Sequence, residues 1–106
     1  MMEISSCFQD DRLTVFLSGE LYYNCVKDVI SAITSRIEES TPLVCILNFQ
    51  DVCFIDESGA AVVLNILREM TKLKGCLSLC GVHNQPMGVF RASGIDKLVR
   101  IEPSEK

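Results

Sequence analysis

The sequence contains a single histidine, His83, and none of the short motifs that mark common hydrolases or nucleotide-dependent enzymes. His83 lies far along the chain from the most conspicuous serine, Ser58, and no Gly-x-Ser-x-Gly brackets that serine. Neither Gly-x-Gly-x-x-Gly nor a phosphate-cradling Gly-x-x-x-x-Gly-Lys loop occurs. We therefore expect no catalytic site and no cofactor.

Clustered positive charge is also missing. The formal net charge is -4, and the chain has no Lys and Arg cluster with interleaved aromatic side chains. Nucleic-acid binders carry such a basic footprint, so we expect no nucleic-acid partner. No apolar run approaches the roughly 20 residues that cross a bilayer, so we expect no membrane insertion.

Six cysteines would suggest disulfides in a secreted miniprotein, but residues 1–6 show neither the basic nor the long apolar segment of an export signal. We therefore expect a reducing, cytoplasmic location. Cys45, Cys53, Cys76 and Cys80 lie in apolar, strand-like stretches, where a free cysteine packs as a small hydrophobe.

A zinc site is not expected either. Cys76 and Cys80 fall on one face of a predicted strand, but the strand rise separates them by about 13 Å. A tetrahedral site would need two further ligands at workable spacing, and His83 is the only histidine. We expect no metal.

The length of 106 residues predicts one domain over residues 1–106, with residues 102–106 as a frayed tail. A domain of this size has little room for a deep substrate cavity, which favours a shallow recognition surface. We expect a binding protein, as a monomer or a weak dimer.

Strand-like and helix-like segments alternate through the second half, after two strand-like segments that read as a hairpin. This order predicts an α/β fold with a mixed sheet, an N-terminal antiparallel hairpin and helices packed on the sheet. Gly19 is expected to end the second strand. Leu43–Leu47 is apolar at consecutive positions, which predicts a central strand covered on both faces. The segment Val52–Ile55 is expected to form a second, separate strand.

The turn Asp56-Glu57-Ser58-Gly59 joins that strand to a helix predicted to begin near Glu57. Asp56 can accept hydrogen bonds from the free N–H groups of the first turn, so it is the predicted N-cap. Phosphate on Ser58 would add about -1.5 to -2 charges near the positive end of the helix dipole. The alternative is that Ser58 only caps the backbone, as serine commonly does at helix starts.

Four segments in this order resemble the STAS domain family, and within it the bacterial anti-sigma factor antagonists. The segments are Leu17–Leu21, Val44–Asn48 with Val52–Gly59, Gly75–Leu79, and Ala92–Leu98. The resemblance extends over most of the chain and implies a single STAS-like domain.

The resemblance also implies a mechanism. In that family the serine or threonine before the glycine, here Ser58, is phosphorylated by a partner that is both a serine-protein kinase and an anti-sigma factor. The unmodified domain binds this partner and frees a sigma factor, phosphorylation releases the domain, and a serine phosphatase reverses the modification. ATP belongs to the kinase, so the resemblance implies a binding module and not an enzyme.

The chain departs from the usual pattern of the family at several positions. Tyr22 and Tyr23 follow Gly-Glu-Leu where many relatives carry an aspartate, and Asn48 replaces an aspartate after the central strand. Glu57 replaces a small residue, and Ala60 a larger aliphatic one. Glu57 either favours the helix N-terminus or hampers phosphorylation by adding negative charge beside Ser58.

We expect the two tyrosines at the edge of the surface that carries Ser58, where exposed aromatic side chains can anchor an interface, although half-buried packing is an equal alternative. The predicted partner-binding residues are Tyr22, Tyr23, Asp56, Glu57, Ser58 and Gly59. Other readings are a non-phosphorylated STAS scaffold, an accessory subunit of a signalling or transport complex, and a nucleotide-binding version.

Overall fold

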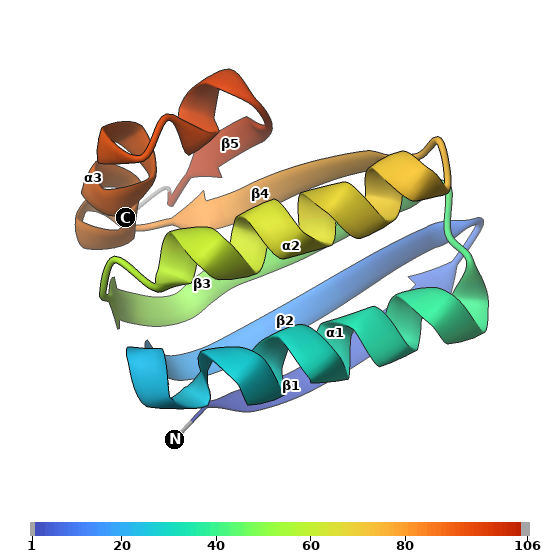
Figure 1. The fold of residues 1–106 in the computed structure, drawn as a ribbon, viewed down its shortest axis with the longest axis horizontal. Helices are drawn as coiled ribbons and strands as arrows, with labels where there is room; N and C mark the ends of the chain where they lie inside the picture. The colour runs from blue at the N-terminus through green and yellow to red at the C-terminus, as the bar shows by residue number, and fades with distance from the viewer. Residues whose placement is uncertain (1, 105–106) are drawn as a thin grey trace.

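Five strands form one mixed sheet in the computed structural model, which describes residues 2–104 (Figure 1). The strands are β1 (Glu3–Gln9), β2 (Arg12–Leu21), β3 (Val44–Ile55), β4 (Cys76–Val82) and β5 (Arg100–Pro103). Their spatial order follows the chain order, with β1 antiparallel to β2 and every later pair parallel. This confirms the predicted α/β class and its N-terminal hairpin.

The helical segments connect the parallel strands. They are η1 (Tyr23–Cys25), α1 (Val26–Ser40), α2 (Gly59–Lys72), α3 (Asn84–Ala92) and η2 (Ile95–Lys97). Figure 1 shows α1 and α2 on one side of the sheet, α1 across β1 and β2 and α2 across β3 and β4. Within residues 2–104, no helix is both long and apolar enough to cross a membrane.

The core lies between the helices and one face of the sheet. Alternate strand residues on that face are buried, and they meet the apolar stripes of α1 and α2. Phe90 of α3 meets Phe49 of β3 edge to face, with ring centroids 5.4 Å apart. Because Phe49 alternates in phase with the buried residues Cys45 and Leu47, α3 covers the same face as α1 and α2.

The opposite face of the sheet, called here the open face, is covered by no helix among the described residues. Val44 and Ile46 are only half-buried there, and Phe16 is 42% exposed. The prediction that the central strand is covered on both faces is therefore wrong. Neighbouring residues of β2 and β4 shield Val44 and Ile46 from the sides, while the face above them stays open.

Two predicted strand boundaries are also wrong. The second strand runs through Gly19 to Leu21, and its register with β3 shifts on either side of Ser18. Gly19 has φ 120°, a conformation that glycine tolerates, so it forms an irregularity inside the strand and not its end. The two apolar segments before Asp56 likewise form one continuous strand, β3.

Of the expected tail, Glu102 and Pro103 lie in β5, and residues 105 and 106 lie outside the described part.

Candidate functional site

The turn Asp56-Glu57-Ser58-Gly59, called here the Ser58 turn, lies at the carboxyl ends of β2 and β3. Leu21 pairs with Ile55 where these parallel strands end, and the Asp56 N–H donates to the Leu21 carbonyl at 3.1 Å. The residues that follow the two strands are therefore neighbours, although more than thirty positions separate them. Parallel sheets commonly place their binding loops at this edge.

Asp56 ties these two loops together. Its Oδ2 accepts a hydrogen bond from the Tyr23 N–H at 2.8 Å, and its Oδ1 accepts one from the Ser58 N–H at 2.9 Å. One carboxylate thus joins the segment entering α1 to the segment entering α2. The prediction that Asp56 is the N-cap is wrong, because α2 begins at Gly59 and Ser58 occupies the capping position. A tight turn intervenes, in which the Gly59 N–H donates to the Asp56 carbonyl.

Ser58 is partly exposed, and its side chain makes no capping hydrogen bond to α2. Its backbone N–H is already satisfied by Asp56. The capping explanation for this serine therefore does not hold in the structure. The residue stands at the amino end of a 14-residue helix, where the helix dipole favours added negative charge.

The two neighbours of Ser58 differ in exposure. Glu57 is exposed, whereas Gly59 is buried. A Cβ atom added to Gly59 would lie 2.7 Å from Cδ1 of Ile55, so a side chain here would force Ile55 to shift. Gly59 therefore allows the close approach of α2 to β3, and Glu57 is the side chain offered to solvent.

Aromatic side chains lie next to this turn. Tyr23 is 79% exposed and Tyr22 is 41% exposed. The ring of Tyr22 packs against Phe54 with centroids 5.3 Å apart. Phe54, itself partly exposed, was not among the predicted site residues. Its place depends on the register between β2 and β3, which pairs it with Glu20.

The environment of these rings is acidic. Partial burial raises the pKa of the Tyr22 hydroxyl, and the Glu20 and Asp56 carboxylates raise it further, Glu20 also through a hydrogen bond. The phenol is therefore neutral at ordinary pH. The site therefore consists of aromatic rings with carboxylates around them, including that of the exposed Glu57.

Gln85 is a further residue of the site that the sequence did not indicate. Its side-chain Oε1 accepts from the Ile55 N–H at 2.9 Å, and its Nε2 donates to the Ile55 carbonyl at 2.8 Å. Pairing between β3 and β4 ends earlier, at Asn48 and Cys80, so the amide takes the place of a neighbouring strand. Gln85 thereby fixes the strand end from which the Ser58 turn starts.

The remaining departures from the family pattern, Asn48 and Ala60, offer no side chain to the surface around Ser58. Asn48 is in the middle of β3, half-buried, and its Oδ1 accepts from the Gln50 N–H at 2.9 Å. Ala60 is buried against the core. Of the departing residues, Tyr22, Tyr23 and Glu57 are the ones that lie at the Ser58 turn.

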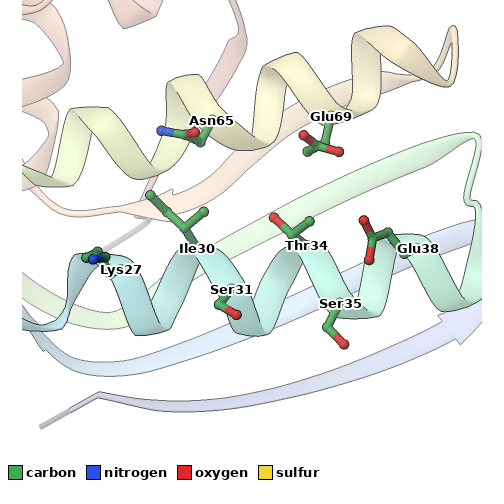
Figure 2. Close-up of a pocket in the computed structure, with 8 residues that line it drawn as sticks. All are labelled: Lys27, Ile30, Ser31, Thr34, Ser35, Glu38, Asn65 and Glu69. Carbon is green, nitrogen blue, oxygen red and sulfur yellow. The ribbon is translucent and has the colours of Figure 1, made fainter.

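A wide polar groove runs between α1 and α2 (Figure 2). Ile30 and Thr34 of α1 point toward α2, whereas Ser35 points away from it. The lining residues are Lys27, Ile30, Ser31, Thr34, Ser35, Glu38, Asn65 and Glu69. None of them is a predicted site residue, and Ile30 is the single apolar one, so the groove does not resemble an enclosed ligand pocket.

The structure gives all six cysteines as free thiols. Of the four expected to pack in the core, Cys45 is buried and Cys80 half-buried, whereas Cys53 and Cys76 are exposed, so the prediction is wrong for these two. Burial raises the pKa of the Cys45 thiol to about 12, which keeps it protonated and unreactive. Among residues 2–104, no three His, Cys, Asp or Glu side chains gather as a metal site would require.

Solved structures share this fold. An anti-sigma factor antagonist from Mycobacterium paratuberculosis matches with a TM-score of 0.86 and 17% identity, over 99% of this chain and 88% of that one. The anti-sigma factor antagonist SpoIIAA in its unphosphorylated form matches with a TM-score of 0.79 and 24% identity, over 95% of this chain and 87% of that one. Its phosphorylated form, from Bacillus, gives 0.68 and 24%, over 95% and 90%.

Sequence comparison gives the same picture. The chain is 28% identical over 85 residues to the anti-sigma F factor antagonist of Lysinibacillus sphaericus, covering 80% of this chain and 73% of that protein. The family model for the STAS domain matches residues 3–106. With the five-stranded sheet, its N-terminal hairpin and the helices on one face, this match establishes that the chain belongs to the STAS domain family.

Proposed function

We propose that this chain is an anti-sigma factor antagonist that switches partners through Ser58. The unphosphorylated protein binds a partner that is both a serine-protein kinase and an anti-sigma factor, and thereby frees a sigma factor. Phosphate on Ser58 releases the partner, and a serine phosphatase restores binding. The chain acts as a substrate and binding module, while ATP and the catalytic groups belong to the kinase.

The observation that carries this proposal is the environment of Ser58. The serine is partly exposed at the amino end of α2, its N–H is held by Asp56, and its side chain does not cap the helix. A phosphate can therefore be added without breaking a capping bond, at a helix end that favours negative charge. The fold supports the modification, and its effect falls on the surface.

Release follows from electrostatics at that surface. Glu20, Asp56 and Glu57 already surround the turn with negative charge. A partner that buries this surface would have to desolvate a further dianion, and any acidic group it brings would be repelled. A loss of about 3 kcal/mol would weaken binding roughly a hundredfold, which suffices for a switch.

The exposed aromatic side chains provide the apolar contact area of the proposed interface. Tyr22, Tyr23 and Phe54 offer rigid apolar area beside the serine, and such residues often anchor protein interfaces. In this proposal the aromatic rings hold the partner, and the charge on Ser58 decides whether it stays.

The test is incubation with the candidate kinase and ATP, followed by mass spectrometry of the intact protein and its peptides. One phosphate is expected on the wild type, located at Ser58, and none on Ser58→Ala. Ser35→Ala is a matched control, because Ser35 is exposed on α1 and points away from α2. Phosphate at another residue, or none with a kinase shown to be active, would overturn the proposal.

A further inference from the structure

The open face of the sheet is unusual for its topology. β2, β3, β4 and β5 are parallel to one another, and sheets that are parallel throughout occur almost entirely with both faces covered. Here α1, α2 and α3 cover one face, and the other carries no helix among residues 2–104. The parallel part of this mixed sheet therefore leaves one face open to a partner.

Uncharged side chains fill the middle of the open face. The strand register places them in rows across the sheet, so that a residue of β2 pairs with one of β3, which pairs with one of β4. The set is Thr14, Phe16, Val44, Ile46, Asn48, Cys76, Ser78 and Cys80. Phe16 and Cys76 are exposed and the others half-buried, so this middle is accessible to a flat partner.

Charged residues lie only toward the margin of the open face. Arg12 stands where β2 begins, beside Val44, with Asp10 of the hairpin turn lining the same hollow. Glu3 and Asp51 stand at the opposite end, on either side of Ser18, and line a second hollow. One corner of the open face thus carries the Arg12 guanidinium beside the Asp10 carboxylate, whereas the other end carries two carboxylates.

The edge strand β5 repeats this pattern on a smaller scale. Arg100 pairs in register with Ser78 of β4, and Glu102 follows two residues later on the same face. Their side chains form an ion pair of 3.3 Å within the chain, and both are largely exposed. In β5 the basic residue, Arg100, therefore comes before the acidic one. The same order holds in β2, where Arg12 comes before Ser18, the residue that pairs with Glu3 and Asp51.

We propose that a second copy of this chain packs face to face on the open face. The two-fold axis lies between the sheets and perpendicular to their strands, so the strands of the two copies run antiparallel. This operation sets Arg12 of one copy opposite Ser18 of the other, flanked by Glu3 and Asp51 of the second copy. It also sets Arg100 of one copy opposite Glu102 of the other.

Self-complementary charge is the reason to choose a second copy over an unrelated protein. A two-fold interface must match its own surface, and each of these contacts occurs twice. The same operation places Thr14 opposite Phe16 and Ile46 opposite Asn48, so a large side chain meets a smaller one. Such alternation suits two sheets that pack about 10 Å apart with their strands nearly aligned.

Sedimentation velocity over a concentration series tests the assembly with the full chain. The wild type is expected to show a monomer–dimer equilibrium. Arg12→Glu places two like-charge contacts in the dimer and is expected to raise the dissociation constant at least tenfold, by about the same factor as Asp51→Lys. Circular dichroism establishes that each variant folds, as expected for exposed positions.

Mixing the two variants gives the decisive measurement. In the mixed dimer, Glu at position 12 of one copy meets Lys at position 51 of the other, and the second contact is the native one. Native mass spectrometry is expected to show mixed dimers in excess of either homodimer. Arg68→Glu is the matched control, since Arg68 is exposed on α2 across the sheet from this face, and it is expected to leave the dissociation constant unchanged.

A wild type that stays monomeric at all concentrations would overturn the proposal. This is also the result expected if a different protein covers the open face. A dimer that responds to Arg68→Glu and not to Arg12→Glu would overturn it equally. Phosphorylation of Ser58 plays no part in either measurement, so the outcome is independent of the proposed switch.

Discussion

The side-chain amide of Gln85 pairs with both backbone polar groups of Ile55, accepting from its N–H and donating to its carbonyl. The first turn of α3 therefore holds the end of β3, from which the Ser58 turn departs. The geometry of the Ser58 turn depends in this way on a residue thirty positions later in the chain.

Gln85→Ala is expected to lower the free energy of unfolding by about 1–3 kcal/mol, because it leaves partly buried backbone groups without partners. Urea denaturation followed by circular dichroism measures the change. Gln85→Glu is the matched control for size: its carboxylate can accept from the Ile55 N–H but cannot donate to the carbonyl. If Gln85→Glu lowers the free energy of unfolding by less than about 0.5 kcal/mol, as a neutral surface substitution would, the bidentate role is contradicted.

Asp56→Ala is expected to cost about 1–3 kcal/mol of stability, since it removes the acceptor of both the Tyr23 and the Ser58 N–H groups. Asp56→Asn keeps one acceptor oxygen and should cost roughly half as much. Hydrogen exchange of the two amides reports the bridge directly. Unchanged protection of both amides in the Ala variant would show that the carboxylate does not hold the loops.

Ser58→Asp is expected to weaken binding to the proposed kinase partner at least tenfold while leaving the circular dichroism spectrum and melting curve nearly unchanged. The fold should tolerate the change because the serine side chain makes no cap and aspartate suits this helix position. Calorimetric titration measures the affinity. The control is Ser58→Asn, because asparagine has the shape of aspartate without its charge. An equal loss of affinity with Asn would exclude charge as the cause. Loss of folding in either variant would identify Ser58 as a structural residue.

The buried thiol of Cys45 predicts a stability loss at alkaline pH. Its pKa is raised to about 12 in the fold from an ordinary value of 9.0, so between these values the unfolded chain has released a proton that the folded chain retains. The free energy of unfolding therefore falls as pH rises through this window, by at most about 1.4 kcal/mol per pH unit from this group. Below pH 9 the contribution is constant.

Cys45→Ala removes the titrating group and is the appropriate comparison. The wild-type stability curve should be steeper than that of the variant between pH 9 and about 12, as measured by urea denaturation. Parallel curves would mean that the thiol ionises equally in both states.

Local pattern was sufficient for much of the fold. The hairpin, the apolar stripe of α1 and the position of the turn before α2 depend on residues close in sequence, and the structure has each of them. Phe54 and Gln85 could not be placed, because their roles depend on strand register and on the end of β3–β4 pairing. The open face was missed for a similar reason: a run of apolar residues does not distinguish shielding by neighbouring strands from cover by a helix.

The Asp56 bridge uses only backbone N–H groups of Tyr23 and Ser58. Any residue other than proline at those two positions could supply the same donors, so the side chains displayed there are interchangeable without dismantling the loop. Related domains could thus display different side chains at these two positions and bind different partners, while all keep the same loop geometry.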